Sequence, residues 1–152
     1  MVISPGGVNV MTAGRGIAHA EETPNTNSGR LSGVQLWAAL PDAYRHTDPS
    51  FFSAEQVPML EMKGGIIHLF AGSFQGVTSP APYFSDIIGM EMQVHPHQTI
   101  QIPLNPQFEH AVLLLDGDLT IKNQPVEHKL LYYLGTCRED LQSPVKQAVE
   151  SY

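Results

Sequence analysis

The sequence is poor in positive charge and in cysteine. Eight lysines and arginines are spread over 152 residues, against fifteen aspartates and glutamates. Because nucleic acids and anionic membranes are bound through clustered lysine and arginine, we expect direct contact with neither. The single cysteine, Cys137, excludes an internal disulfide. We therefore expect a reducing compartment, which is the cytoplasm or, in a eukaryote, also the nucleus.

Long hydrophobic runs are missing as well. No apolar stretch reaches the ~18 residues that a membrane-spanning helix needs, and the first ten residues lack the basic and apolar regions of a secretory signal. Charged residues make up 15% of the chain and hydrophobic residues 42%. This balance predicts a packed core of one ordinary domain, or of two small ones, rather than a disordered tail.

Glycine and proline, by contrast, are abundant, with 13 and 12 residues. So many helix breakers argue against a helical bundle and favour short strands joined by turns. The predicted fold is therefore all-β, a β-sandwich or barrel. The expected strands are 8–11, 17–21, 31–40, 65–70, 85–94, 99–103, 110–115, 119–121 and 129–134. Only 138–151 could hold a helix, and Pro144 interrupts it.

The predicted strands suggest a core in the second half of the chain. Asp116-Gly117 separates two β-prone runs, which predicts a hairpin between 110–115 and 119–121. Trp37 is expected to anchor a core rather than to bind a substrate. The side chains expected to share one buried core are Val112, Leu113, Leu114, Ile121, Leu130 and Tyr132.

His19 and Glu21 are the first candidates for chemistry. They lie two apart in the predicted strand 17–21, so their side chains should share one face. An imidazole and a carboxylate together suit Fe(II), Mn(II) or Zn(II). A solvent-facing strand carries the same pair, so the spacing leaves both interpretations open. Arg15, between two glycines, could hold a neighbouring carboxylate or the backbone of its turn, or could face solvent.

The surroundings of His19 are more specific than the pair itself. Residues 11–21, Met-Thr-Ala-Gly-Arg-Gly-Ile-Ala-His-Ala-Glu, resemble the signature of the pirin family. The resemblance continues through Leu-Ser-Gly-Val-Gln-Leu-Trp at 31–37, Ser-Pro-Ala at 79–81 and Tyr-Leu-Gly-Thr at 133–136. Pirins are bicupins, in which two cupin barrels pack face to face. The first barrel of the family holds an iron with three histidines and one glutamate.

The resemblance implies a truncated bicupin. Residues 1–40 would be the C-terminal part of the N-terminal cupin barrel, 41–58 a linker, and 59–152 the C-terminal cupin barrel, incomplete at its own C-terminus. His19 and Glu21 match the last two of the four metal ligands, and Arg15 is a candidate to support them.

The first two ligands of the family stand in a His-Pro-His-Arg-Gly-Phe-Glu segment well before the signature. This chain has ten residues before Met11 and no such segment. We therefore expect Fe(II) to be weakly bound or absent in this chain. His95 and His97 are the nearest substitutes, but no glutamate follows at the spacing of a cupin motif. They are interpreted as part of a polar strand edge or turn.

For function, the resemblance implies a non-haem iron protein with flavonol (quercetin) 2,3-dioxygenase-type oxidoreductase activity on a small, flavonol-like aromatic substrate. Two alternatives remain. One is an iron- or redox-dependent transcriptional cofactor that acts through protein partners, and the other is an inactive fragment. An unclosed first barrel would leave unpaired strand edges, which predicts a homodimer through that barrel.

Overall fold

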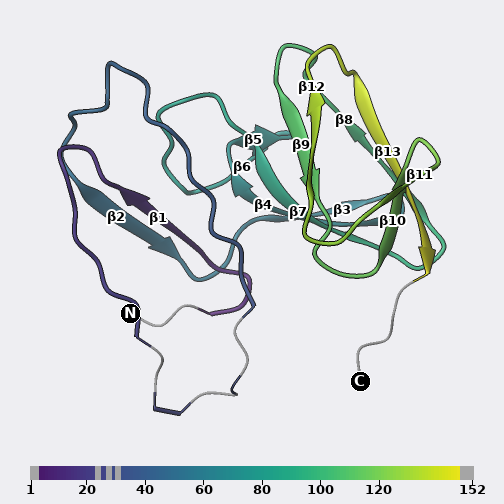
Figure 1. Ribbon diagram of the computed structural model, residues 1–152, viewed down its shortest axis with the longest axis horizontal. Helices are drawn as coiled ribbons and strands as arrows, with labels where there is room; N and C mark the ends of the chain where they lie inside the picture. The colour runs from purple at the N-terminus through teal and green to yellow at the C-terminus, as the bar shows by residue number, and fades with distance from the viewer. Residues whose placement is uncertain (1–3, 23–24, 27–28, 30–31, 148–152) are drawn as a thin grey trace. The chain divides into compact units, whose positions relative to one another are not determined.

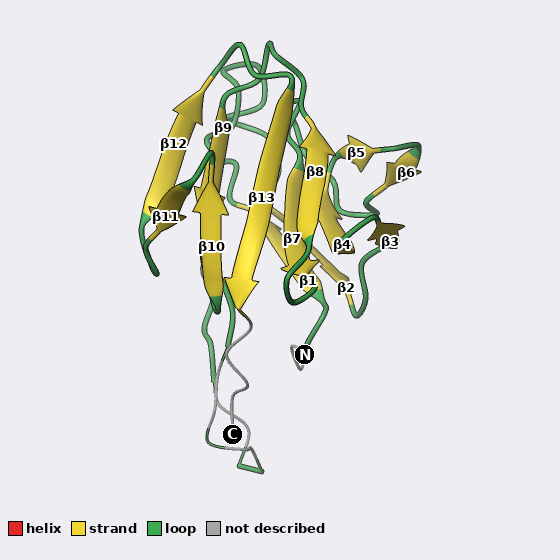
Figure 2. Ribbon diagram, turned by 90° about the vertical axis from the view of Figure 1, so that its right-hand side faces the viewer, coloured by secondary structure: helices red, strands yellow, loops and turns green. Residues whose placement is uncertain are grey.

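The computed structural model describes residues 4–22, 25–26, 29 and 32–147, and for 142–147 the backbone alone. Its described part is all-β, with strands and loops and no helix (Figures 1 and 2). The predicted fold class is thereby confirmed. No described helix exists that is long and apolar enough to span a membrane.

The chain divides into two compact units. The first unit comprises Met1–Val57 and Phe70–Gly89, and the second unit comprises Pro58–Leu69 and Met90–Tyr152. Neither unit is continuous in sequence, because the chain returns to the first unit after residue 69. The boundaries expected from the pirin resemblance, at 40 and 58, refer to pieces of two barrels and stay a prediction.

The first unit contains two small antiparallel sheets. β1 (Val8–Thr12) pairs with β2 (Ser50–Ala54), from Val8 opposite Ala54 to Thr12 opposite Ser50. Part of the segment expected as a linker is thus a strand. β5 (Ser73–Phe74) and β6 (Val77–Thr78) are joined by Gln75 and Gly76, both with positive φ. Two such residues form the type I′ turn that suits the twist of a hairpin.

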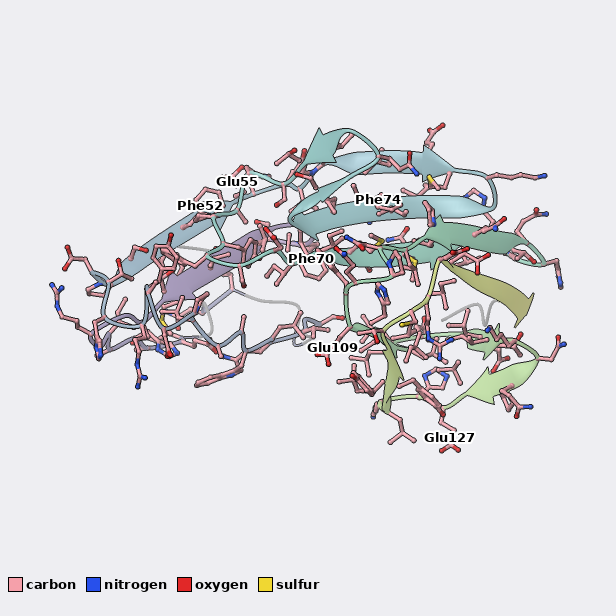
Figure 3. All side chains as sticks on the ribbon, turned by 90° about the horizontal axis from the view of Figure 1, so that it is seen from above. Phe52, Glu55, Phe70, Phe74, Glu109 and Glu127 are labelled. Carbon is pink, nitrogen blue, oxygen red and sulfur yellow. The ribbon has the colours of Figure 1, made fainter. Side chains whose placement is uncertain are left out.

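Few apolar side chains of the first unit are buried. Among its described residues they are Ala71, Phe74 and Ala81, and Figure 3 labels Phe74, the last residue of β5. Several of its large apolar residues are exposed, namely Val34, Leu36, Trp37, Tyr44, Phe51 and Ile88, and most of the others are only partly buried. The expectation that Trp37 anchors a core is wrong, because 90% of its surface is accessible.

Two predicted strands of the first unit are also wrong. Residues 17–21 are irregular, and so is 32–40; Leu31 lies outside the described residues. Both stretches have suitable β-propensity, but that propensity reflects packing on a half-buried sheet and not an intrinsic preference of the backbone. In the described part of the chain, neither stretch has a neighbouring strand to supply such packing.

The second unit is built from three sheets. The first has the order β3-β4-β7, the second β11-β10-β13-β8, and the third β12-β9. The bounds are β3 (Met59–Met62), β4 (Gly65–Ala71), β7 (Gly89–Val94), β8 (Thr99–Pro103), β9 (His110–Leu113), β10 (Asp118–Ile121), β11 (Gln124–Val126), β12 (Leu131–Gly135) and β13 (Asp140–Gln147). The last two residues of β4 and the first of β7 belong to the first unit.

The core of the second unit follows from strict alternation along its strands. Every second residue of β4 and β8 is buried, and the largest fully buried side chains among the described residues are Ile67, Leu69, Ile100 and Ile102. Burying each such side chain contributes roughly 1.5–3 kcal/mol. Val112, Leu114, Val126 and Leu141 complete this core. Glu109 and Glu127 are exposed at its periphery (Figure 3).

The expected core of this region is correct in part. Val112 and Leu114 are buried, whereas Leu130 is 49% exposed and does not belong to the core. Leu113, Ile121 and Tyr132 are partly buried. Leu130 immediately precedes β12, where no strand alternation directs its side chain inward.

Strand pairing in the second unit differs from the sequence expectation. Asp116-Gly117 does not close a hairpin, because β9 pairs with β12 while β10 pairs with β11 and β13. The turn carries the chain from one sheet to another. The hairpin of this region is closed by Lys122 and Asn123, both with positive φ, between β10 and β11.

The stretch expected to hold a helix forms β13 instead. It pairs with β8 from Asp140 opposite Pro103 to Pro144 opposite Thr99. Pro144 disfavours a helix. It is the last residue of β13 that pairs with β8, so its missing N–H interrupts the hydrogen bonds between these two strands least.

Candidate functional site

The glycine-rich turn of residues 13–16 follows directly after β1. The Gly16 N–H donates to the Ala13 carbonyl at 2.8 Å, and the Arg15 N–H donates to the Thr47 carbonyl at 3.0 Å. Gly14 has a φ of +50°, and a Cβ there would overlap the Thr47 carbonyl oxygen. Only glycine therefore allows the turn to lie this close to the loop at residues 46–48.

Arg15 binds the same loop through its side chain. One guanidinium nitrogen donates to the His46 carbonyl at 3.3 Å, and the other forms an ion pair with the Asp48 carboxylate. Both charged side chains are largely exposed. These contacts match the roles considered for Arg15 only in part, because the bonded carboxylate and carbonyl belong to the loop at residues 46–48 and not to Glu21 or to the turn of Arg15 itself. The carboxylate is that of Asp48, a partner which the sequence did not indicate.

His19 and Glu21 lie downstream of this turn, in the irregular part of the first unit. Both side chains are exposed, and the strand that was to place them on one face is not formed. Their donor types suit Fe(II), but even an open catalytic site normally has three protein ligands. Across the described residues, no three His, Cys, Asp or Glu side chains are grouped to hold a metal ion. These two donors alone do not fit a mononuclear iron.

His95 and His97 lie in the turn between β7 and β8. The His95 N–H donates to the Gly64 carbonyl at 2.9 Å, and the Gln98 N–H donates to the His95 carbonyl at 3.1 Å. Both side chains are exposed, and His97 has a φ of +58°. Their interpretation as part of a polar turn is confirmed.

A second histidine–carboxylate pair was missed in the sequence. His68 of β4 and Glu91 of β7 approach each other in the second unit, with 3.4 Å between Nδ1 and Oε2. They are 23 residues apart, so the pair could be found only by knowing that β4 and β7 are neighbours in one sheet. With two donors, it is no more complete as a metal site than His19 and Glu21.

Comparison with known proteins supports the pirin resemblance. The family model described as Pirin matches residues 1–38, which include the turn, His19 and Glu21. A Pseudomonas aeruginosa protein named "Putative quercetin 2,3-dioxygenase PA1205" is 37% identical over 141 residues, 93% of this chain and 44% of its own length. A pirin-like protein of Caulobacter vibrioides is 37% identical over 67% of this chain. The chain belongs to the pirin family.

Further matches cover most of the chain, both among solved structures and among protein sequences. The crystal structure of a quercetin 2,3-dioxygenase from Acinetobacter baumannii superposes with a TM-score of 0.85 at 30% identity, covering 96% of this chain and 48% of that one. Human pirin is 23% identical over 84% of this chain. The chain spans about half the length of the pirin relatives it matches. The predicted cupin-like, truncated-bicupin fold class is thus confirmed.

Proposed function

We propose that this pirin-family chain contributes to an oxidoreductase of the quercetin 2,3-dioxygenase type, acting on a small flavonol-like aromatic with dioxygen. The single observation that supports this most is the likeness over nearly the whole chain to the A. baumannii quercetin 2,3-dioxygenase. The name of the P. aeruginosa relative points the same way. No specific contact in the described residues favours the transcriptional-cofactor alternative.

In this proposal, His19 and Glu21 are two ligands of a non-haem Fe(II). The support is their position inside the segment that matches the pirin family, together with ligand types that suit this metal. Because two donors do not complete an iron site, the remaining ligands come from outside the described residues, in a longer chain or a second copy. A homodimer through the first unit is one such arrangement.

The test measures metal and activity together. The purified chain is analysed for iron, manganese and zinc, then incubated with Fe(II) without oxygen, re-analysed, and assayed for quercetin oxidation. We expect far less than one iron per chain and slow oxidation, with both decreased by His19→Ala and by Glu21→Gln. His128→Ala, which removes another exposed histidine, is the matched control and should change neither.

Four results would contradict parts of this proposal. Iron binding that is unaffected by His19→Ala would exclude His19 as a ligand of the iron. Near-stoichiometric iron that is lost in His19→Ala would contradict the expected low iron content. It would show that no longer chain is needed, because a second copy or another histidine completes the site. Iron-loaded protein that oxidises quercetin no faster than free Fe(II) would exclude the activity for this chain. A monodisperse monomer in light scattering at micromolar concentration would exclude the homodimer.

A further inference from the structure

The first unit contains an open pocket at its surface, and this pocket lies outside the pirin signature. Its volume is about 440 Å³, and it is lined by Tyr44, Tyr83, Phe84, Ser85 and Asp86. This volume lies within the range of small-molecule sites, which is roughly 300–1,000 Å³. We name this site the Tyr44–Asp86 pocket. Neither His19 nor Glu21 lines it, so its occupant need not be the substrate proposed above.

Two irregular segments form the pocket. Tyr44 lies in a turn in which its N–H donates to the Pro41 carbonyl at 2.8 Å, and the Thr47 N–H donates to the Tyr44 carbonyl at 3.0 Å. The other lining residues come from the stretch between β6 and β7. That stretch begins at the buried Ser79, whose hydroxyl donates to the Phe70 carbonyl at 2.8 Å. Backbone hydrogen bonds therefore hold the turn at Tyr44, and a side-chain hydrogen bond holds the start of the second segment at Ser79.

Aromatic rings form one wall of the pocket. The ring centroids of Tyr44 and Phe84 are 5.1 Å apart, with their planes tilted by 45°. Tyr44 is half-exposed, so the wall is accessible from solvent. The Tyr83 hydroxyl donates to the Phe70 carbonyl at 3.4 Å, which orients its ring. Because ring faces are electron-rich, such a wall attracts cations in addition to apolar groups.

The charge at the pocket is negative. Asp86 is the charged residue among the five that line it, and Ser85 adds a hydroxyl. The chain as a whole carries a net charge of −7. An anionic ligand would be repelled, and a neutral apolar ligand would displace water from the carboxylate without replacing its interactions. A cation gains from both the rings and the carboxylate.

We propose that the Tyr44–Asp86 pocket binds an organic cation with an apolar surface, of the quaternary or trimethylated ammonium class. Such a cation has no N–H groups that need hydrogen-bond acceptors, and it is weakly hydrated. It therefore suits a site with electron-rich rings and a single carboxylate. The Ser85 hydroxyl offers a hydrogen bond to a polar group attached to the cation.

The test compares choline with 3,3-dimethyl-1-butanol, which has the same shape and no charge. Each is titrated into the full chain while ring-proton chemical shifts are followed by NMR. We expect choline to bind about tenfold more tightly than the alcohol, because only choline gains from the rings and the carboxylate. A tenfold difference in affinity corresponds to ~1.4 kcal/mol of binding free energy. Raising the salt concentration should weaken choline binding alone.

Variants locate the site. Asp86→Asn and Phe84→Leu should each weaken choline binding by about three- to tenfold, because each removes one charge or one ring from the pocket. The matched controls are Asp42→Asn, an acidic residue beside Tyr44 that does not line the pocket, and Tyr133→Phe in the second unit. Both should leave the affinity unchanged. Thermal melting of each variant verifies that the fold is retained, and Asp86→Glu should restore binding if Asp86→Asn loses it.

Three outcomes would overturn the proposal. The first is equal or tighter binding of the neutral alcohol, which would make the pocket a purely apolar site. The second is the absence of shifts at Tyr44 and Phe84 at tens of millimolar choline. The third is choline binding that is unchanged in Asp86→Asn and Phe84→Leu, which would place the cation elsewhere. None of these outcomes bears on iron binding by His19, so this proposal and the proposed function can fail separately.

Discussion

The first and second units belong to one chain, yet they bury their side chains differently. The second unit places Ile67, Leu69, Ile100 and Ile102 in a core from which solvent is almost excluded. The first unit leaves Trp37 almost fully exposed. The difference shows that β-prone residues become strands where another strand pairs with them, and remain irregular where the described structure offers no partner.

Two short segments illustrate this. Thr99–Pro103 forms β8 because β13 pairs along its whole length, which satisfies its backbone and turns both isoleucines inward. Val-Gln-Leu-Trp at 34–37 is also rich in β-prone residues but stays irregular. An unpaired strand gains neither hydrogen bonds nor buried area, so propensity alone does not fold it.

The largest expected effect contrasts the two units directly. Ile100→Ala should lower the free energy of unfolding by about 2–5 kcal/mol, because it removes a fully buried side chain from a closely packed core. Trp37→Ala should change it by less than about 0.5 kcal/mol, although more atoms are removed, because the side chain is exposed. Urea unfolding of both variants makes the comparison. A larger loss from Trp37→Ala would show that segment 32–40 packs in solution.

The next largest effect concerns the close approach of the turn at Gly14 to the loop at residues 46–48 in the first unit. Gly14→Ala should destabilise the protein by about 1–3 kcal/mol, since the residue has a positive φ and its Cβ would overlap the Thr47 carbonyl. Gly33→Ala is the matched control, because no atom lies within 4 Å of a Cβ at that position. Thermal unfolding of both variants measures the difference. Equal stability of the two would mean that the turn does not lie against residues 46–48.

A smaller effect is expected for the exposed ion pair of the same turn. Removing Arg15 and Asp48 in a double-mutant cycle should give a coupling free energy below about 1 kcal/mol, because both groups are solvated. The Arg45–Asp42 pair, at 3.4 Å, is the control and should couple more weakly, since Arg15 also binds the His46 carbonyl. The coupling should decrease with salt, and a salt-independent value would contradict a solvated pair.

The smallest effect concerns titration in the second unit. The Tyr133 hydroxyl donates to Glu109 Oε1 at 2.9 Å, and this hydrogen bond raises the pKa of Tyr133 above its ordinary value, with burial and the charge of Glu109 as lesser causes. The bond favours the neutral phenol, so it is present at neutral pH and is lost as the pH rises through the raised pKa. In Glu109→Gln, the pKa of Tyr133 should fall, as followed by phenolate absorbance.

Glu127→Gln is the control for this titration. Its backbone N–H, and not its carboxylate, bonds a tyrosine hydroxyl, that of Tyr132. Glu127→Gln should leave the Tyr133 titration where it is. If both variants lowered the pKa of Tyr133 equally, general surface charge and not the Glu109 hydrogen bond would be the cause.

For the candidate site, the sequence indicated residue types and family but not geometry. The match of residues 1–38 to the pirin family confirms the family that the signature around His19 indicated, whereas the metal-ligand roles of His19 and Glu21 stay a proposal. The expected strand 17–21 was wrong, and the Arg15 contact with Asp48 joins residues 33 positions apart. No local pattern encodes such a contact, because it depends on where the loop after residue 41 returns.

The sequence by itself determined the local features of this protein. The all-β class, the bounds of Thr99–Pro103 and the polar turn at His95 all follow from side-chain alternation and from residues that break strands. These depend on interactions within a few residues, so a single segment contains the information.

Only the tertiary structure decided which strands pair and which side chains are buried. Asp116-Gly117 has the stronger hairpin pattern, yet Lys122-Asn123 closes the hairpin, because β9 finds its partner in the distant β12. Pairing is selected by the total backbone hydrogen bonding and apolar burial of the assembled sheets. Those quantities belong to segments far apart in the chain, and Trp37 remains exposed for the same reason.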